Sequence, residues 1–183
     1  MAVGDTVTNV MQALVESRPT SAGALYECAL QAKRQAVAST DTDARRRLYD
    51  LAVDFAARSI TLSRESRDAL DAGLTALLLA EVLPELGRTV TAVYILETAL
   101  TDLVMFAQCT PRLDRPYFDR LMMDLRLSWA NLSIVSGVAT PDRVRWTVDL
   151  LFADNQVFRR TVVTGVYAEV MGRIYAFLDA PRA

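Results

Sequence analysis

The feature that most constrains the fold is a pair of apolar segments, residues 69–83 and 88–108, separated by a break at Pro84 and Gly87. The second segment carries apolar side chains around almost its whole circumference. A helix of this kind must lie inside a protein or a membrane, and the carboxylates of Glu97 and Asp102 argue against a membrane. The sequence therefore predicts a central helix at about 88–108 surrounded by other helices.

Helix signals recur along the rest of the chain, whereas strand signals are scarce. Apolar residues repeat at spacings of three and four, and Asp, Ser, Thr, Pro and Gly residues stand where helices begin and end. The expected helices lie near 5–17, 22–38, 40–62, 66–83, 88–108, 114–136, 141–151 and 161–178. We therefore predict an all-α fold, a single globular bundle of about eight helices, as one domain over residues 1–183.

Burial in the central helix gives this prediction a direct check. Leu96, Leu100 and Val104 are expected to be fully buried by the surrounding helices. The tryptophans Trp129 and Trp146 are expected to be core or interface anchors.

The absence of histidine excludes more chemistry than any motif suggests. It removes the usual general base, the Ser-His-Asp arrangement and most zinc and iron sites. Cys28 and Cys109 are too few and too far apart for a metal cluster, and we expect both to be buried free thiols. The glycines form no phosphate-binding loop. We therefore expect a protein that is not an enzyme and needs no metal and no cofactor.

The charge balance points away from nucleic acid. The chain has a formal net charge of −2 and an isoelectric point near 5.2, so it lacks the basic footprint of a nucleic-acid-binding protein. We expect no signal peptide before the first helix. Because Glu169 and Arg173 interrupt the last apolar helix, we also expect no membrane span there. We expect a cytoplasmic protein.

The junction between the two apolar segments is similar to a known family. Residues 77–93 read Leu-Leu-Leu-Ala-Glu-Val-Leu-Pro-Glu-Leu-Gly-Arg-Thr-Val-Thr-Ala-Val. They resemble the first homology region of the B-cell lymphoma two (Bcl) family of apoptosis regulators, in which an apolar hairpin helix begins at a Gly-Arg pair. The Asn-Trp pair before it is missing, as in many viral members. Trp129 stands 41 residues after Arg88 (129 − 88), which resembles the tryptophan-marked second homology region.

The resemblance implies a viral Bcl-like inhibitor of apoptosis in the host cytoplasm, which captures the amphipathic helix of a pro-apoptotic partner in a surface groove. Arg88 would pair with an aspartate of the partner, next to Gly87. The partner's leucines would enter pockets formed by apolar side chains of three helices: Leu51, Phe55, Leu74, Leu78 and Val93.

Other interpretations remain open. The Leu25-Tyr26-Glu27 segment, followed by helical hairpins, resembles the flagellin export chaperones, which also bind a partner helix without catalysis. Gly87 and Arg88 could also form an ordinary helix junction, because Gly commonly ends helices. A homodimer is left open.

Overall fold

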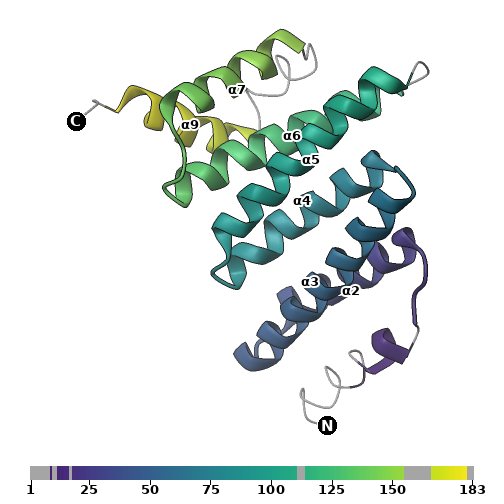
Figure 1. Ribbon diagram of the computed structural model, residues 1–183. Helices are drawn as coiled ribbons and strands as arrows, with labels where there is room; N and C mark the ends of the chain where they lie inside the picture. The colour runs from purple at the N-terminus through teal and green to yellow at the C-terminus, as the bar shows by residue number, and fades with distance from the viewer. Residues whose placement is uncertain (1–8, 10–11, 17, 111–113, 155–165, 181–183) are drawn as a thin grey trace. The chain divides into compact units, whose positions relative to one another are not determined.

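The computed structural model describes residues 9, 12–16, 18–110, 114–154 and 166–180. Within these residues every regular element is an α-helix and no strand occurs (Figure 1), which confirms the all-α class. Residues 12–16 are helical, and the following helices are α2 (Ala22–Ala38), α3 (Thr42–Glu65), α4 (Ala69–Glu85), α5 (Thr89–Cys109), α6 (Arg115–Val135), α7 (Pro141–Asp154) and α9 (Val166–Asp179). The predicted helix near 5–17 lies mostly outside the described residues, as do the first residues of the last predicted helix.

The chain divides into two compact units, Met1–Arg88 and Thr89–Ala183. The boundary follows Gly87 and Arg88 and coincides with the beginning of α5. The first unit contains α2, α3 and α4, and the second contains α5, α6, α7 and α9. Each unit is described by itself below, and the organisation as a single domain stays a prediction.

Side-chain oxygens cap the N-terminal ends of four helices. The Oδ1 of Asp41 accepts hydrogen bonds from the backbone N–H groups of Asp43 and Ala44, at 2.9 and 3.0 Å. These bonds hold the pKa of the Asp41 carboxyl below its ordinary value. Ser21, Asp68 and Asp114 cap α2, α4 and α6 in the same way, because the first N–H groups of a helix have no partner within it.

Three helices end in the same way. After α4, Gly87 takes a φ of 72°, and the N–H of Arg88 donates to the carbonyl of Leu83 at 2.8 Å. After α6, Gly137 takes a φ of 73°, and the N–H of Val138 donates to the carbonyl of Ser133 at 3.0 Å. Arg67 holds the same place after α3 with a φ of 59°. A helix stops sharply where a residue in the left-handed conformation is followed by a residue whose N–H donates to the carbonyl five residues before it.

The interior of the first unit contains many small side chains beside larger ones such as Phe55 and Leu48. The α2 helix packs along α3, which in turn packs against α4. The contacts between these helices include alanines that are almost fully buried: Ala29, Ala32, Ala36, Ala52, Ala56, Ala72 and Ala76. Because alanine has a short side chain, the helix backbones can approach closely. One buried polar link accompanies them, since the Ser59 hydroxyl donates to the carbonyl of Ala22 at 2.8 Å and contacts the Thr75 hydroxyl at 3.3 Å.

The second unit is organised around α6, which packs against α5, α7 and α9. Larger side chains fill its interior, including Met123, Leu125 and Trp129. On α5, Leu96 is fully buried as predicted. Leu100 is only half-buried and Val104 is 43% exposed, so the expectation of full burial is wrong for both. An all-round apolar pattern does not reveal which sides of a helix acquire neighbours.

Two further observations concern α5 and its end. Among the described residues, α5 is the one helix that is long and apolar enough to cross a membrane. Its most apolar stretch has a mean hydropathy of 1.6, and 28% of that stretch is buried. One such helix is weak evidence for a membrane, because core helices of soluble proteins pass the same test. Cys109, the last residue of α5, is exposed and Cys28 is half-buried, which corrects the prediction of two buried thiols; neither of these two residues forms a disulfide.

Candidate protein-binding groove

An open hollow of about 390 Å³ lies between α5, α6 and α7 in the second unit. Its apolar lining comes from all three helices: Leu100, Val104, Met105, Met122, Trp129, Trp146 and Leu150. Lining residues advance toward the C-terminus on α5 and α7 and toward the N-terminus on α6. Because α6 packs against both α5 and α7, it forms the floor of the hollow, and α5 and α7 form the two walls. We call this hollow the α5–α7 groove.

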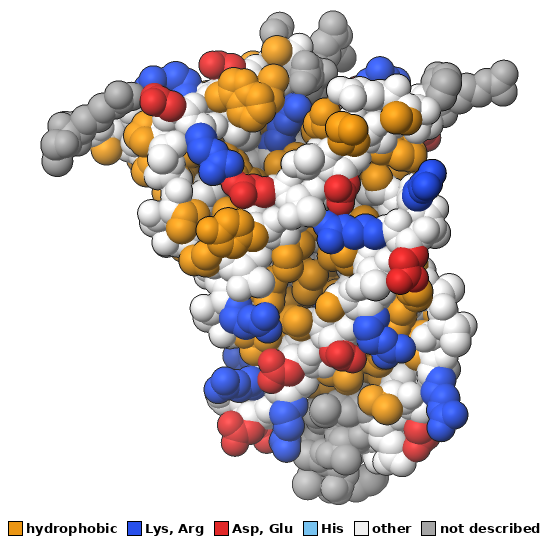
Figure 2. Space-filling model, in the orientation of Figure 1, with side chains coloured by type: hydrophobic (Ala, Val, Ile, Leu, Met, Phe, Trp, Pro, Cys, Tyr) orange, Lys and Arg blue, Asp and Glu red, His pale blue; other side chains and the backbone are white. Residues whose placement is uncertain are grey.

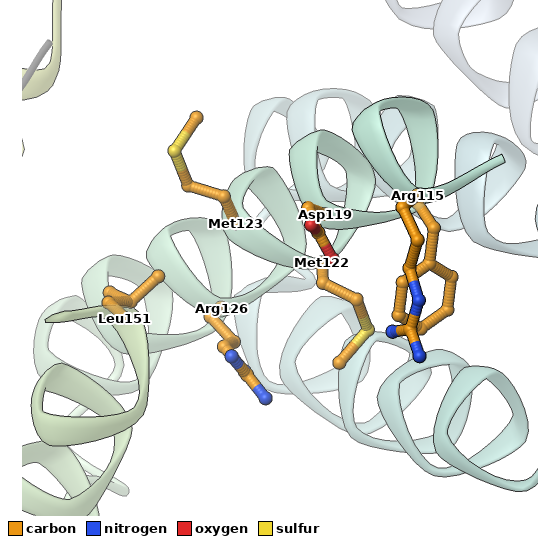
Figure 3. Close-up of a pocket in the computed structure, with 7 residues that line it drawn as sticks. Arg115, Asp119, Met122, Met123, Arg126 and Leu151 are labelled. Carbon is orange, nitrogen blue, oxygen red and sulfur yellow. The ribbon is translucent and has the colours of Figure 1, made fainter. Parts of the chain in front are cut away.

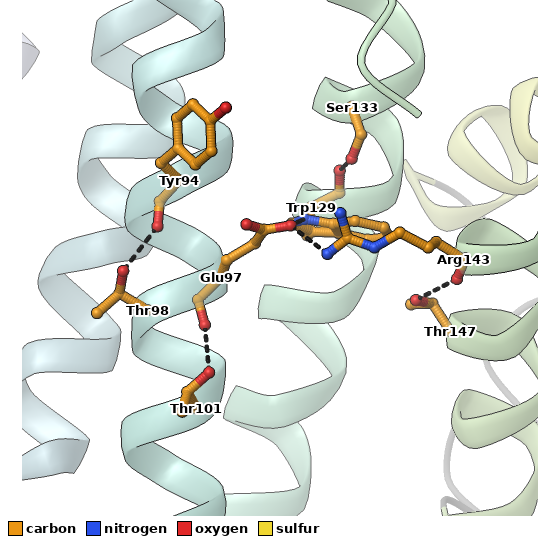
Figure 4. A network of polar contacts seen from close by, with 8 residues as sticks. All are labelled: Tyr94, Glu97, Thr98, Thr101, Trp129, Ser133, Arg143 and Thr147. Carbon is orange, nitrogen blue, oxygen red and sulfur yellow. Dashed lines mark hydrogen bonds and ion pairs between the residues drawn. The ribbon is translucent and has the colours of Figure 1, made fainter. Parts of the chain in front are cut away.

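A polar bridge crosses one end of the α5–α7 groove. The Trp129 Nε1–H donates to Oε1 of Glu97 at 3.1 Å, and Arg143 forms an ion pair with the same carboxylate oxygen (Figure 4). The Arg143 guanidinium also lies over the Trp129 ring, 5.1 Å from its centroid. One residue from each helix thus meets at this point. The bridge fixes the spacing of the two walls where the groove begins.

Large apolar side chains stand exposed beyond the bridge. Trp146 on α7 is 65% exposed, and Met105 and Val104 on α5 are 58% and 43% exposed. Apolar side chains that gather in a hollow, instead of being scattered singly, mark surfaces for partners. Methionine adapts its shape to different partners, which suits such a surface.

A second hollow of about 440 Å³ extends the α5–α7 groove along α6 toward its N-terminal end. Met122 and Arg126 line both hollows, so the two lie next to each other along α6. Figure 3 shows Arg115, Met122 and Arg126 pointing to the same side of α6, whereas Met123 points to the other side. Phe118 and Leu151 complete the apolar lining, and Asp119 lies between the arginines.

A different set of polar contacts fastens α9 to α6. The Tyr167 hydroxyl donates to Oδ1 of Asp124 at 2.7 Å and accepts from Nη2 of Arg120 at 2.7 Å. Burial raises the pKa of Tyr167 to about 12, and its hydrogen bond to the Asp124 carboxylate adds to the rise. Farther along, Nη1 of Arg173 donates to Oδ1 of Asn131 at 2.7 Å. These contacts hold α9 against α6, and none of the residues that make them lines the two hollows.

The sequence-predicted groove residues are divided between the units. Phe55 and Leu78, in the first unit, are 2% and 4% exposed, and Val93, in the second, is 3% exposed. Leu51 and Leu74 are half-buried. Leu51 and Phe55 line a common hollow of about 290 Å³ with Val15 and Pro19. A partner could reach the three buried side chains only if they became uncovered, and the predicted groove stays a prediction.

Gly87 and Arg88 occupy the place that the resemblance gave them. Gly87 ends α4 and Arg88 directly precedes α5. The Arg88 side chain is exposed. A free surface position suits either a residue that recognises a partner or an ordinary junction.

Sequence reasoning missed the α5–α7 groove, although parts of its signal were visible. The all-round apolar pattern of 88–108 indicated more apolar surface than one neighbour can cover. Trp146 was recognised as an anchor residue, but its 65% exposure depends on the tertiary placement of α7. The groove arises from residues up to 53 positions apart (150 − 97), and local patterns do not encode such proximity.

Comparisons with protein-family models, with curated proteins and with solved structures find no match to this chain. Among the described residues, no group of three or more Cys, Asp or Glu side chains is placed to hold a metal ion. On the face drawn in Figure 2, Lys and Arg side chains alternate with Asp and Glu side chains, and no broad area carries one charge. The most distinctive surface feature of the described residues is therefore the α5–α7 groove with its exposed apolar side chains.

Proposed function

We propose that this chain is a non-enzymatic binding protein that captures one amphipathic helix of a partner protein in the α5–α7 groove. The observation that carries the proposal is the exposed apolar lining of a hollow with two helical walls and a helical floor. An amphipathic helix buries its apolar face in such a groove through residues spaced three and four apart. Trp146 is the expected centre of the binding energy, because a large aromatic side chain gains most when it is desolvated.

The experiment selects binders from a displayed library of amphipathic helices and measures their affinity for variants. Trp146→Ser and Met105→Ser should each weaken binding by about tenfold or more, since each removes an anchor worth at least about 1.4 kcal/mol. Val135→Ser is the matched control, because Val135 is 57% exposed in the same unit and does not line the groove. A library that yields no binder, or binders indifferent to both groove variants, would contradict the proposal.

The more specific hypothesis is a viral Bcl-like inhibitor of apoptosis, with pro-apoptotic helices as its partners. It is supported by Gly87 and Arg88, which lie at the junction before the apolar α5 as the resemblance implied. Titration calorimetry with a panel of pro-apoptotic helical peptides tests it. Arg88→Ala should weaken binding roughly thirtyfold, because losing one side of a desolvated ion pair typically costs about 2–5 kcal/mol.

The two hypotheses predict different variant profiles. Binding to the surface around Arg88 should respond to Arg88→Ala and not to Trp146→Ser, whereas binding in the α5–α7 groove should do the reverse. The alternative of an export chaperone also involves capture of a partner helix, and it differs in the source of that helix.

A further inference from the structure

We infer that the helix captured in the α5–α7 groove is acidic along one flank, with two carboxylates about three turns apart facing Arg115 and Arg126 of α6. The inference rests on the proposed function and adds the chemistry and the spacing of the partner. It concerns a site formed by residues of the second unit alone.

The spacing of the two arginines on α6 sets the spacing on the partner. Arg115 and Arg126 are 11 residues apart (126 − 115), which is a rise of about 16 Å along the helix axis. Eleven residues also bring the chain back to within about 20° of the same direction. Both side chains therefore point to one side of α6, with Met122 between them (Figure 3). A second helix lying along α6 would match this pair with acidic residues at positions i and i+11.

The α5 wall carries acidic residues and no basic ones. The α5 helix contains no lysine or arginine, and its charged residues are Glu97 and Asp102. Glu97 is already engaged by Trp129 and Arg143, so the bridge adds no net charge to the groove. The attraction for carboxylates therefore lies along α6 and is absent along α5. This difference predicts a partner with acidic residues on one flank only.

Asp119 moderates this attraction but does not cancel it. It lines the extended groove between the two arginines, so the α6 side presents two cations and one anion. Complementary charge in a partly desolvated groove favours one orientation of the bound helix and speeds association. The inference requires only that the two guanidinium groups face the groove, whatever else they contact.

The test compares three designed helical peptides of about 18 residues, or five turns, with one apolar stripe. The first carries Glu at positions i and i+11 on one flank, the second carries Gln at both, and the third carries the second Glu at i+5, on a different face. At low salt the first should bind about tenfold more tightly than the other two. The difference should shrink as salt screens the charges.

Variants of the protein locate the effect. Arg115→Gln and Arg126→Gln should each remove most of the difference in affinity between the i, i+11 Glu peptide and the Gln peptide. Arg145→Gln is the control, because Arg145 is exposed on α7 and does not line the groove. Circular dichroism verifies folding, and Arg115, which is exposed near the beginning of α6, remains informative if Arg126→Gln disturbs the fold.

The outcomes separate this inference from the function on which it rests. Equal binding of the Glu and Gln peptides, both weakened by Trp146→Ser, would overturn the acidic partner and leave the groove as a helix-binding site. Failure of all three peptides and of the displayed library would overturn both. A concentration-dependent dimer that excludes the peptides would make a second copy of this chain the occupant, and would also overturn the inference.

Discussion

The two units differ in the proportion of small side chains in their interiors, because buried alanines are more numerous in the first unit than in the second. In the first unit, Ala32 and Ala36 of α2 and Ala52 of α3 are completely buried, and a serine and a threonine form the link between helices inside the core. In the second unit, large side chains such as Met123 and Trp129 fill the interior. Its polar contacts lie near the surface and involve charged groups, as in the Glu97–Arg143 pair.

The size of the side chains affects how much space remains between neighbouring helices. Short side chains let helix backbones come close together and leave little space between them. In the second unit α6 packs against both α5 and α7, and the α5–α7 groove is lined by all three helices. Under the proposed function, the second unit supplies the surface that binds the partner helix.

The largest expected effect contrasts two leucines of α5. Leu96→Ala should lower the free energy of unfolding by about 2–5 kcal/mol, because Leu96 is fully buried. Leu100→Ala should cost less, because Leu100 is half-buried and lines the groove. Urea unfolding followed by circular dichroism measures both. Equal losses would mean that Leu100, in the groove wall, is packed as tightly as Leu96 in the core.

The next-largest expected effect is the change in stability when a side chain is enlarged in each of the two units. Ala32→Leu should cost about 1–3 kcal/mol, because the α2–α3 interface has no space for three more carbons. Thr101→Leu, at an exposed position in the groove, should change stability by less than about 0.5 kcal/mol. The exposed Ala38→Leu, at the end of α2, is the control for helix propensity. A tolerated leucine at position 32 would contradict the close approach.

The bridge that begins the groove should contribute less. Glu97→Ala removes the acceptor of the Trp129 Nε1–H, and an unsatisfied part-buried donor costs about 1–2 kcal/mol. Arg143→Ala should cost less than about 1 kcal/mol, because its side chain is 59% exposed and the pair is screened by water. Thermal and urea unfolding of the two variants show which one loses more stability. A larger loss in Arg143→Ala than in Glu97→Ala would mean that the ion pair, and not the Trp129 hydrogen bond, contributes most of the stability of the bridge.

The smallest expected effect concerns alkaline pH in the second unit. Tyr167 has a pKa of about 12 against an ordinary value of 10.0, so the folded protein retains a proton that the unfolded chain releases. This contribution to stability is fully present below pH 10 and is lost as the pH rises toward 12. Tyr167→Phe should therefore show a shallower fall of the unfolding free energy across this range. The exposed Tyr94→Phe is the control, and an unchanged slope in Tyr167→Phe would show that Tyr167 titrates normally.

Local signals predicted the helices well. The helix expected at 22–38 is observed as Ala22–Ala38, and Asp41, Asp114 and Gly137 stand at helix ends as expected. Capping and periodicity depend on residues within a few positions of one another, and a sequence displays them directly. The predicted burial of Val104 was wrong, because exposure depends on which helix lies opposite.

The candidate site was much harder to predict. Leu51, Phe55 and Leu78 were chosen through a family resemblance, and their side chains are half-buried or buried in the first unit. The α5–α7 groove depends on a contact between Glu97 and Arg143, which are 46 positions apart. Neither residue belongs to a motif, and only the tertiary arrangement brings them together around Trp129.

The repeated way of ending helices has a consequence for how the chain folds. Sharp stops after α3, α4 and α6 are each followed within a few residues by the next helix. Within each unit, many contacts therefore join helices that follow one another along the chain. Closing such short loops sacrifices little chain entropy, and proteins with mostly local contacts fold quickly. Both the alanine-packed unit and the groove-bearing unit should accordingly form from successive helical hairpins, in milliseconds or less.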